Sequence, residues 1–377
     1  MLLKLNKLYF LYKKNIFILN LFLLLNFIQT KGQETKWHYL LQNNNLNEFV
    51  QLNGKANFTL INGVLIGTSK LNTPNSFLAT KTKYSNFILE FDVLIDNDLN
   101  SGVQFRSESL KNYLDGRVHG YQCEIETSSR KWAGGIYDEA RRGWLYPLSR
   151  NKTGQEAFIR GSWNKYRIEA IGNSIKTFVN SVEVSNLFDD MTQEGFIAFQ
   201  VHGISNPEQE GKQVRWKNIR ILVTDLERNR MIALNKAPHI SYLDGTLTQE
   251  EKRLGFRMLW DGKTTNGWRG AKMTTFPKKG WEIKDGILTV QASEGEESRN
   301  GGDIVTIESF RNFELSVDFL LSPGANSGIK YFVKTNLNKG EGSSIGLEFQ
   351  ILDDEKHLDY KLGKNGNRSV GSLYDLI

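Results

Sequence analysis

Three polar side chains share one face of a short predicted strand. Residues 121–126 read Tyr-Gln-Cys-Glu-Ile-Glu, and successive side chains of a strand point to opposite faces. Gln122, Glu124 and Glu126 therefore share one face, whereas Cys123 points the other way. A carboxylate beside an amide on a sheet surface can move a proton and hydrogen-bond a polar substrate.

A similar arrangement recurs about 226 residues later in the chain. Residues 347–352 place Glu348 and Gln350 on one strand face and apolar residues on the other. Here the carboxylate precedes the amide, so it lies two positions earlier along its strand than Glu124 does. The two strands therefore offer similar groups in a different order.

The spacing of Glu124 and Glu126 is compatible with an ordinary glycosidase, which is therefore an open alternative. A retaining glycosidase holds its two carboxyl groups about 5 Å apart, and alternate residues of a strand lie roughly 6.5–7 Å apart. Glu124 and Glu126 are near that range. The alternative is that this strand face is simply solvated.

A polar loop after the first strand supplies further candidates. Two acids and two arginines lie between Tyr137 and Trp144, which suits a proton donor, an oxyanion-stabilising arginine and an aromatic sugar platform. The candidates in this loop are Tyr137, Asp138, Arg141 and Trp144. Arg106 is expected to bind sugar oxygens together with Gln122, and His202 is a second candidate base. His202 is read equally well as a surface residue.

Acidic residues also follow the second strand. Asp353, Asp354 and His357 lie in one loop, and such a density of ligands suits a divalent cation such as Ca²⁺, which would stabilise an enolate. An exposed acidic loop is the alternative. Glu348 and His357 are the candidate catalytic groups of this copy. The candidate substrate-binding residues are Asn326, Gln350 and Tyr374.

Composition and charge exclude some classes of protein. The 377 residues suffice for about two domains of ordinary size. Lysines near the N-terminus account for much of the net charge of +6, and the other basic residues are interspersed with acids, which disfavours nucleic-acid binding. Cys123 is the one cysteine, so no intramolecular disulfide can form. We read it as a buried packing residue rather than a nucleophile.

Residues 1–32 are predicted to be a signal peptide. A lysine-bearing start precedes an apolar run over residues 16–28, which is too short to favour a membrane span. An uncleaved signal anchor is the alternative. After cleavage no stable membrane span is expected, and the rest of the chain is predicted to be secreted or periplasmic.

Short apolar runs alternate with turn signals over residues 37–224, and no convincing amphipathic helix interrupts them. The Asn62-Gly63 and Asn180-Ser181 pairs predict tight hairpins. This pattern predicts an all-β antiparallel sandwich or jelly roll. Residues 225–255 are predicted to form a linker, in which the spacing of Thr248 and Glu251 fits a capping box at the start of a short helix.

Residues 256–377 repeat motifs of the first domain and are predicted to form a second jelly roll. This copy has no counterpart of residues 163–223, so either the chain is a fragment or the second domain is incomplete. We favour a fragment, because a half-sandwich would leave open strand edges. The matched segments are 62–65 with 285–288, 85–92 with 311–318, 100–103 with 326–329, and 136–138 with 373–375.

At these motifs the sequence resembles the 3-keto-disaccharide hydrolase family. In the second copy the matching residues are Leu259-Trp260-Asp261-Gly262-Lys263, Gly267-Trp268, Asn312-Phe313-Glu314-Leu315, Asn326-Ser327-Gly328-Ile329, Glu348-Phe349-Gln350-Ile351-Leu352-Asp353 and Leu373-Tyr374. The first copy resembles a sister branch through Asn100-Ser101-Gly102, Gly120-Tyr121-Gln122-Cys123-Glu124-Ile125, Gly134-Gly135-Ile136-Tyr137-Asp138-Glu139, Trp163-Asn164 and Trp216-Lys217-Asn218-Ile219. The resemblance implies a concanavalin A-like jelly roll and a carbohydrate substrate.

The resemblance also implies a chemistry. The ketone of a 3-keto sugar acidifies the neighbouring C2–H, so a base can remove that proton, the C1 substituent leaves and water then adds. Glu124 is the expected base or acid. Two departures separate the copies: the carboxylate has moved along the strand, and Phe332 stands where the first copy has Arg106. A non-catalytic carbohydrate-binding module and an interaction domain are the competing hypotheses.

Overall fold

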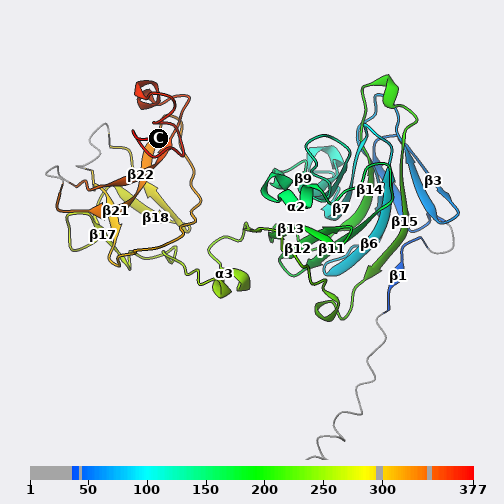
Figure 1. The fold of residues 1–377 in the computed structure, drawn as a ribbon, viewed down its shortest axis with the longest axis horizontal. Helices are drawn as coiled ribbons and strands as arrows, with labels where there is room; N and C mark the ends of the chain where they lie inside the picture. Colours follow the sequence, from blue (N-terminus) through cyan, green and yellow to red (C-terminus); the bar gives the residue numbers. More distant parts are fainter. Residues whose placement is uncertain (1–35, 42–44, 294–299, 338–341) are drawn as a thin grey trace, which may run out of the picture. The chain divides into compact units, whose positions relative to one another are not determined.

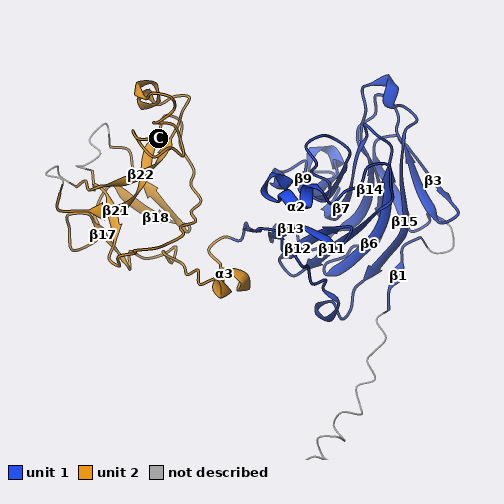
Figure 2. Ribbon diagram, in the orientation of Figure 1, with its two compact units in different colours: residues 1–243 blue, residues 244–377 orange. Residues whose placement is uncertain are grey.

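The computed structural model describes residues 36–41, 45–293, 300–337 and 342–377. Contacts divide the chain into two compact units, Met1–Leu243 and Asp244–Ile377 (Figure 2). The predicted signal peptide lies outside the described residues. None of the helices in the described part is long and apolar enough to cross a bilayer.

The first unit is a sandwich of two β-sheets (Figure 1). One sheet has nine strands among the described residues, in the order β16-β13-β12-β11-β6-β15-β4-β3 with β1 also paired to β15. Their bounds are β1 His38–Tyr39, β3 Asn57–Ile61, β4 Val64–Thr68, β6 Phe87–Ile95, β11 Asn164–Ile171, β12 Ser174–Val179, β13 Val182–Phe188, β15 Gln213–Leu222 and β16 His239–Ser241. All pairs are antiparallel except β13 with β16.

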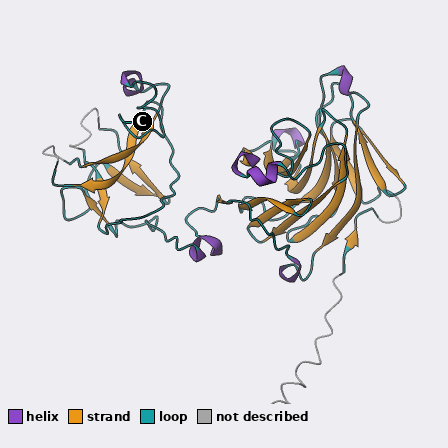
Figure 3. Ribbon diagram, viewed as in Figure 1, coloured by secondary structure: helices purple, strands orange, loops and turns teal. Residues whose placement is uncertain are grey.

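The other sheet has seven strands within the described ranges, in the order β10-β9-β8-β7-β14-β5-β2, and is antiparallel throughout. The bounds are β2 Phe49–Asn53, β5 Ser76–Thr80, β7 Asn100–Glu108, β8 His119–Glu126, β9 Ile136–Glu139, β10 Gly143–Tyr146 and β14 Phe196–Val201. Short helical turns cap the loops (Figure 3): η2 Leu114–Gly116, η3 Leu148–Arg150, α2 Lys152–Gln155, η4 Pro207–Gln209 and η5 Glu227–Asn229. The predicted all-β sandwich is confirmed for this unit.

The core lies between the two sheets. Alternate residues of facing strands fill it, and their rings pack closely: Phe91 stacks on Tyr166 at 5.2 Å, and Phe105 on Tyr121 at 5.6 Å between centroids. Trp216 is fully buried there. The tight turns follow the sequence signals, since Asn62 and Gly63 both have positive φ, as a type I′ turn requires.

The predicted linker, residues 225–255, contributes more to the first unit than expected. Residues 239–241 form β16 and extend the nine-stranded sheet by parallel pairing with β13. The predicted short helix is present as α3, Gln249–Arg253. Thr248 and Glu251 form its capping box, each side chain accepting from the other's backbone N–H.

The second unit does not form the predicted sandwich within its described residues. Its strands there make three two-stranded sheets, β17 with β20, β18 with β19 and β21 with β22. Residues 313–318 match part of β6 in sequence but are not a strand, and several of their side chains are exposed. The bounds are β17 Trp268–Gly270, β18 Trp281–Lys284, β19 Ile287–Val290, β20 Ile304–Thr306, β21 Asn326–Lys334 and β22 Ile345–Leu352, with η6 at Leu358–Leu362.

Candidate active site

Strand β8, an inner strand of the seven-stranded sheet, divides its side chains between the core and the outer face of that sheet. Tyr121 and Cys123 belong to the inter-sheet core and are fully buried. Strand alternation therefore turns Gln122, Glu124 and Glu126 away from that core. All three are nonetheless only 3% exposed, so other groups must cover them.

Glu124 accepts hydrogen bonds from three different elements. Its Oε1 accepts from Asn100 Nδ2 on β7 at 2.5 Å and from the Arg130 guanidinium at 3.4 Å. Its Oε2 accepts from Gln122 Nε2 at 3.0 Å. The register allows this grouping, because Gly102 lies directly opposite Glu124 and leaves room for the Gln122 side chain.

The amide of Gln122 is itself held by β7. Gln104 Nε2 donates to Gln122 Oε1 at 2.7 Å, and Ser107 Oγ donates to Gln104 Oε1 at 2.8 Å. Gln104 and Ser107 are fully buried. A continuous chain of side-chain hydrogen bonds thus runs from Ser107 to Glu124.

Burial dominates the electrostatics of Glu124. Burial, and to a lesser extent the neighbouring charge of Glu126, raise the pKa of the carboxyl from its ordinary 4.5 to a net value of about 7. The hydrogen bonds from Asn100 and Gln122 and the charge of Arg130 act in the opposite direction. A carboxyl with a pKa near neutrality can both take up and release a proton at physiological pH.

Glu126 is occupied by structural contacts. Its Oε1 accepts from the backbone N–H of Trp132, and its Oε2 accepts from Arg130 Nε and Ser128 Oγ, all within 2.8 Å. These bonds fix the turn that follows β8. Glu126 therefore shares Arg130 with Glu124, and its role as the second member of a glycosidase pair stays a prediction.

An aromatic cluster adjoins the two carboxylates. Trp132 packs edge-on against Trp144 at 4.7 Å, and Tyr137 against Trp144 at 5.2 Å. The Arg130 guanidinium lies 4.9 Å and 4.8 Å from the two indole ring centroids, a cation–π arrangement. The predicted proximity of Tyr137 and Trp144 to the site is therefore seen, with Arg130 lying against both indoles and Glu124.

Asp138 and Arg141 lie on the opposite face from Glu124. Asp138 pairs with Tyr121 in register, and its buried carboxylate bonds to the side chains of Arg141 and Arg142. Arg142 also bridges to buried Asp189. The prediction of Asp138 as an acid and Arg141 as a ligand for sugar was wrong in its geometry, because alternation along β9 separates Asp138 from Tyr137.

Arg106 and His202 are also outside this group. Arg106 is fully buried and donates to the carbonyls of Ser85 and Gly172, so it connects β7 to loops of the other sheet instead of binding sugar. Burial lowers its pKa to about 10. His202 is exposed beyond the end of β14, with Nδ1 2.7 Å from the carbonyl oxygen of Gly203.

The second unit repeats the backbone frame of this site. Gly328 lies opposite Gln350, and the Glu348 carboxylate leans over that glycine, where an added Cβ would come within 1.9 Å of its Oε1. Gln350 is buried and its Nε2 lies 3.4 Å from Asn326 Oδ1. Gln350 thus lies beside Asn326, with Glu348 over the neighbouring Gly328, and the catalytic and substrate-binding roles of these three residues stay predictions.

The predicted cation site in the second unit is not formed. Asp353 accepts from three backbone N–H groups, those of Gly324, Glu355 and Lys356, which lowers its pKa. Asp354 accepts from the N–H of Val370, and His357 Nδ1 from that of Asp359. Across the described part of the chain, no group of three His, Cys, Asp or Glu residues could hold a metal. These side chains stabilise turns.

Tyr374 belongs to a separate polar cluster. Its hydroxyl donates to Asp359 Oδ2 at 3.0 Å, and the Arg368 guanidinium lies 5.1 Å from its ring centroid. Arg368 also pairs with Asp359. His357 lies just before η6, where its Nδ1 accepts from the backbone N–H of Asp359, and its catalytic role stays a prediction.

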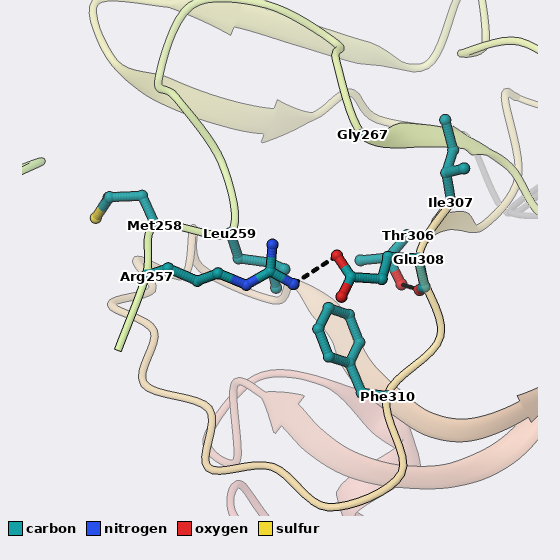
Figure 4. A pocket seen from close by; sticks show the side chains of 8 residues that line it. All are labelled: Arg257, Met258, Leu259, Gly267, Thr306, Ile307, Glu308 and Phe310. Carbon is teal, nitrogen blue, oxygen red and sulfur yellow. Dashed lines mark hydrogen bonds and ion pairs between the residues drawn. The ribbon is translucent and has the colours of Figure 1, made fainter. Parts of the chain in front are cut away.

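Two surface hollows contain none of the predicted site residues. One, of about 240 Å³, is lined in the second unit by Arg257, Met258, Leu259, Gly267, Thr306, Ile307, Glu308 and Phe310. Figure 4 shows the Arg257–Glu308 ion pair at its side. The other lies near Asn97 and Lys212. The expected groove around Glu124 is thus not one of these hollows.

Four residues of the Glu124 group were not singled out by sequence reasoning. Asn100 and Gln104 alternate on β7 with core residues, so strand parity could have identified them. Arg130 and Trp132 lie in an irregular turn, where no periodicity predicts which way a side chain points. Of these four, Asn100 and Arg130 donate to Glu124 itself, Gln104 donates to Gln122, and the backbone of Trp132 donates to Glu126.

Comparison with known proteins agrees with the sequence motifs. The family model described as a 3-keto-alpha-glucoside-1,2-lyase-like domain matches residues 36–222 and 255–377. A 3-keto-disaccharide hydrolase of Bacteroides thetaiotaomicron is 40% identical over an alignment of 133 residues, and the match covers 33% of this chain. The match spans 46% of that relative, about half of its length.

Solved structures that resemble about half of the chain include a carbohydrate-binding module and a β-glucanase. A carbohydrate-binding module CBM66 from Bacillus subtilis is 17% identical with a TM-score of 0.33, covering 46% of this chain and 95% of its own. A β-glucanase from Bacillus licheniformis is 12% identical with a TM-score of 0.34, covering 51% and 100%. The family model matches most of the sequence in two segments, and the chain therefore belongs to the family of 3-keto-alpha-glucoside-1,2-lyase-like domains.

Proposed function

We propose that the first unit cleaves the glycosidic bond of 3-keto glycosides, with Glu124 as the acid–base group. The observation that carries this proposal is a buried carboxyl with a pKa of about 7, set on a sheet face beside three aromatic rings. A keto sugar needs one base of moderate strength, because its C2–H is already acidified. Aromatic rings suit the apolar faces of a sugar.

The reaction would proceed by elimination followed by hydration. The Glu124 carboxylate takes the C2 proton, the electron pair forms the C1–C2 double bond, and the C1–O bond breaks. The departing oxygen takes up a proton, which the protonated Glu124 can return to it. Water then adds its oxygen to C1 and a hydrogen to C2. Direct hydrolysis of the same bond is the alternative course.

Substrate must displace the Arg130 side chain. In this structure its guanidinium lies against Glu124 and the faces of both tryptophans, yet the side chain is 41% exposed. The bond to Glu124 is the long one, 3.4 Å against 2.8 Å to Glu126. Arg130 can therefore turn outward, retaining Glu126, and uncover both the carboxyl and the indoles.

Carbohydrate binding without catalysis is the second candidate. The aromatic cluster favours it, since indole faces bind sugars whether or not chemistry follows. Under this hypothesis Glu124 only accepts hydrogen bonds from sugar hydroxyls. Glu348 in the second unit is open to the same two readings.

The deciding experiment uses the full chain and a 4-nitrophenyl 3-keto-glucoside, whose cleavage releases a coloured phenol. Glu124→Gln should lower kcat by about 10²–10⁴-fold while sugar binding survives, because the amide cannot take a proton. Glu348→Gln measures the share of the second unit. Glu156→Gln is the matched control, because Glu156 is an exposed carboxylate whose partner is Lys131. Binding of the glycoside without any turnover by the natural sequence would favour the binding module.

We further propose that the protein is exported, as the N-terminal segment predicts. The test is the mature N-terminus of the protein recovered from the growth medium or the periplasm. A start near residue 33 is expected, and an intact N-terminus on a membrane fraction would indicate the signal anchor instead.

A further inference from the structure

The hydrogen-bond chain behind Glu124 has a definite direction. Its members are Ser107, Gln104, Gln122 and Glu124, and each of the first three donates toward the next. We propose that this chain is reversible: both glutamine amides rotate by 180° when Glu124 gains a proton, so that Glu124 is fully hydrogen-bonded as a base and as an acid. Gln104 and Ser107 are then positioning residues of the site.

The observed arrangement fits an ionised Glu124. A carboxylate only accepts, so Gln122 must present its NH₂ to it and its carbonyl to Gln104. Gln104 must then present its NH₂ to Gln122 and its carbonyl to Ser107, whose hydroxyl donates. Each contact has one donor and one acceptor. Since these side chains are almost fully buried, a mismatched contact would cost the desolvation of a polar group.

The reversed arrangement is equally complete. A proton on Oε2 of Glu124 donates to the carbonyl of a rotated Gln122, whose NH₂ then donates to the carbonyl of a rotated Gln104. The NH₂ of Gln104 donates to Ser107 Oγ, which can accept. Ser107 has other acceptors for its hydrogen, the backbone carbonyl oxygens of Phe105 at 3.0 Å and Tyr121 at 3.3 Å.

The remaining partners of Glu124 need not move. Asn100 and Arg130 both donate to Oε1, the oxygen that keeps no proton in the reversed state. The charged and titratable groups that face the carboxyl are Glu126 on β8, Arg130 in the following turn and Tyr137 on β9. Behind the strand, the Tyr166 hydroxyl contacts the backbone oxygen of Glu124 and not its side chain.

Reversibility matters for a residue that must both remove a proton and return it. A fixed relay would favour one protonation state and penalise the other by leaving a buried group unpaired. Its use in catalysis rests on the function proposed above, in which Glu124 takes the C2 proton. The reversal itself depends only on protonation of Glu124, and so it can be tested without a substrate.

The test follows the side-chain NH₂ signals of glutamine in the full chain, labelled with ¹⁵N-glutamine, between pH 5 and 9. The signals of Gln104 and Gln122 are expected to shift together, with the midpoint of the Glu124 carboxyl signal. Gln51 is the control, because its Nε2 donates to the backbone carbonyls of Gly54 and Ala56. All of the coupled shift should disappear in Glu124→Gln.

Gln104→Glu gives the relay a fixed direction. An ionised carboxylate at this position accepts only, so Gln122 must turn its NH₂ to it and its carbonyl to Glu124. Glu124 then has to be protonated, and its midpoint should rise by at least one pH unit. If the Gln104 signals stay constant through the titration of Glu124, the relay does not reverse and the proposal is wrong. That titration in the natural sequence decides the matter even if Gln104→Glu does not fold.

Discussion

The two units carry the same strand pair in different surroundings. In both, an Asn-Ser-Gly segment begins a strand, and its glycine lies opposite the second polar residue of the partner strand, Glu124 or Gln350. The register shifts six residues after the asparagine. The residue at the shift has positive φ in both, 45° for Arg106 and 52° for Phe332. The next strand also pairs alike, since Cys123 lies opposite Ile136 and Phe349 opposite Leu373.

Burial differs between the units although the backbone does not. Tyr121 and Cys123 are fully buried, whereas their counterparts Leu347 and Phe349 are 38% and 41% exposed. The nine-stranded sheet covers Tyr121 and Cys123, and among the described residues of the second unit no sheet covers Leu347 and Phe349. Register and bulge are therefore determined within the strand pair itself, whereas burial depends on the opposing sheet.

The chemistry of the two sites differs at equivalent positions. Gln104, which can donate and accept, is replaced by Lys330, which only donates. Lys330 Nζ bonds to Asp303 at 3.0 Å and its cross-strand partner is Glu348 itself. A reversible relay is therefore specific to the first unit, and the second combines a fixed cation with a carboxylate.

The largest expected difference concerns the residue at the register shift. Arg106→Met removes the side-chain donor of the Ser85 and Gly172 carbonyls and one of the two donors to Asn86 Oδ1. It should lower the free energy of unfolding of the first unit by about 3 kcal/mol. Phe332→Met changes a side chain that is 60% exposed and should cost less than about 0.5 kcal/mol. Urea unfolding of the full chain, with one transition followed for each unit, measures both. Equal losses would show that Arg106 does not join the two sheets.

A second difference appears in the pH dependence of stability. The pKa of Glu124 is raised from 4.5 to about 7 in the folded state, so its protonated form favours folding. The contribution of Glu124 to the free energy of unfolding is fully present below pH 4.5. It is lost as the pH rises through 7, and the loss for this shift in pKa is about 3 kcal/mol. Glu124→Gln should therefore unfold like the natural sequence near pH 4.5 and be the more stable protein above pH 7.5.

Stability measured from pH 4 to 9 provides the check on Glu124. Glu348→Gln is the comparison variant, because it removes the carboxylate of the other strand pair. A constant offset between Glu124→Gln and the natural sequence across this range would mean that burial does not perturb Glu124.

Strand parity accounts for what the sequence could predict. The alternation of side chains correctly predicted that Gln122 and Glu124 point away from the core and that Cys123 points into it. Repeated motifs identified equivalent positions in the two units. The alternation could also have separated Asp138 from Tyr137, which lie on opposite faces because they are adjacent on β9. The hairpin turns and the capping box followed from local rules that depend on few residues.

The alternation of side chains along a strand does not predict which residues a long side chain will contact. The guanidinium of Arg106 donates to carbonyls in loops of the other sheet, at Ser85 and Gly172. Arg130 reaches both Glu124 and Glu126 from an irregular turn. The acidic loop at Asp353 resembled a cation site in sequence, but its carboxylates cap backbone N–H groups that only the folded loop presents.

The smallest expected difference tests the glycine that both sites share. An added Cβ at Gly102 would lie 2.4 Å from Cδ of Gln122, which is buried and bonded at both ends of its amide. Gly102→Ala should therefore displace Gln122, break its two bonds and cost about 1–3 kcal/mol. At Gly328 the obstacle is the carboxylate end of Glu348, a flexible side chain on a more open strand pair, so Gly328→Ala should cost about 1 kcal/mol or less. Urea unfolding measures both losses, and the Gln122 amide signal reports the displacement. If the two substitutions cost the same and the Gln122 signal does not move, burial does not hold the Gln122 side chain in place.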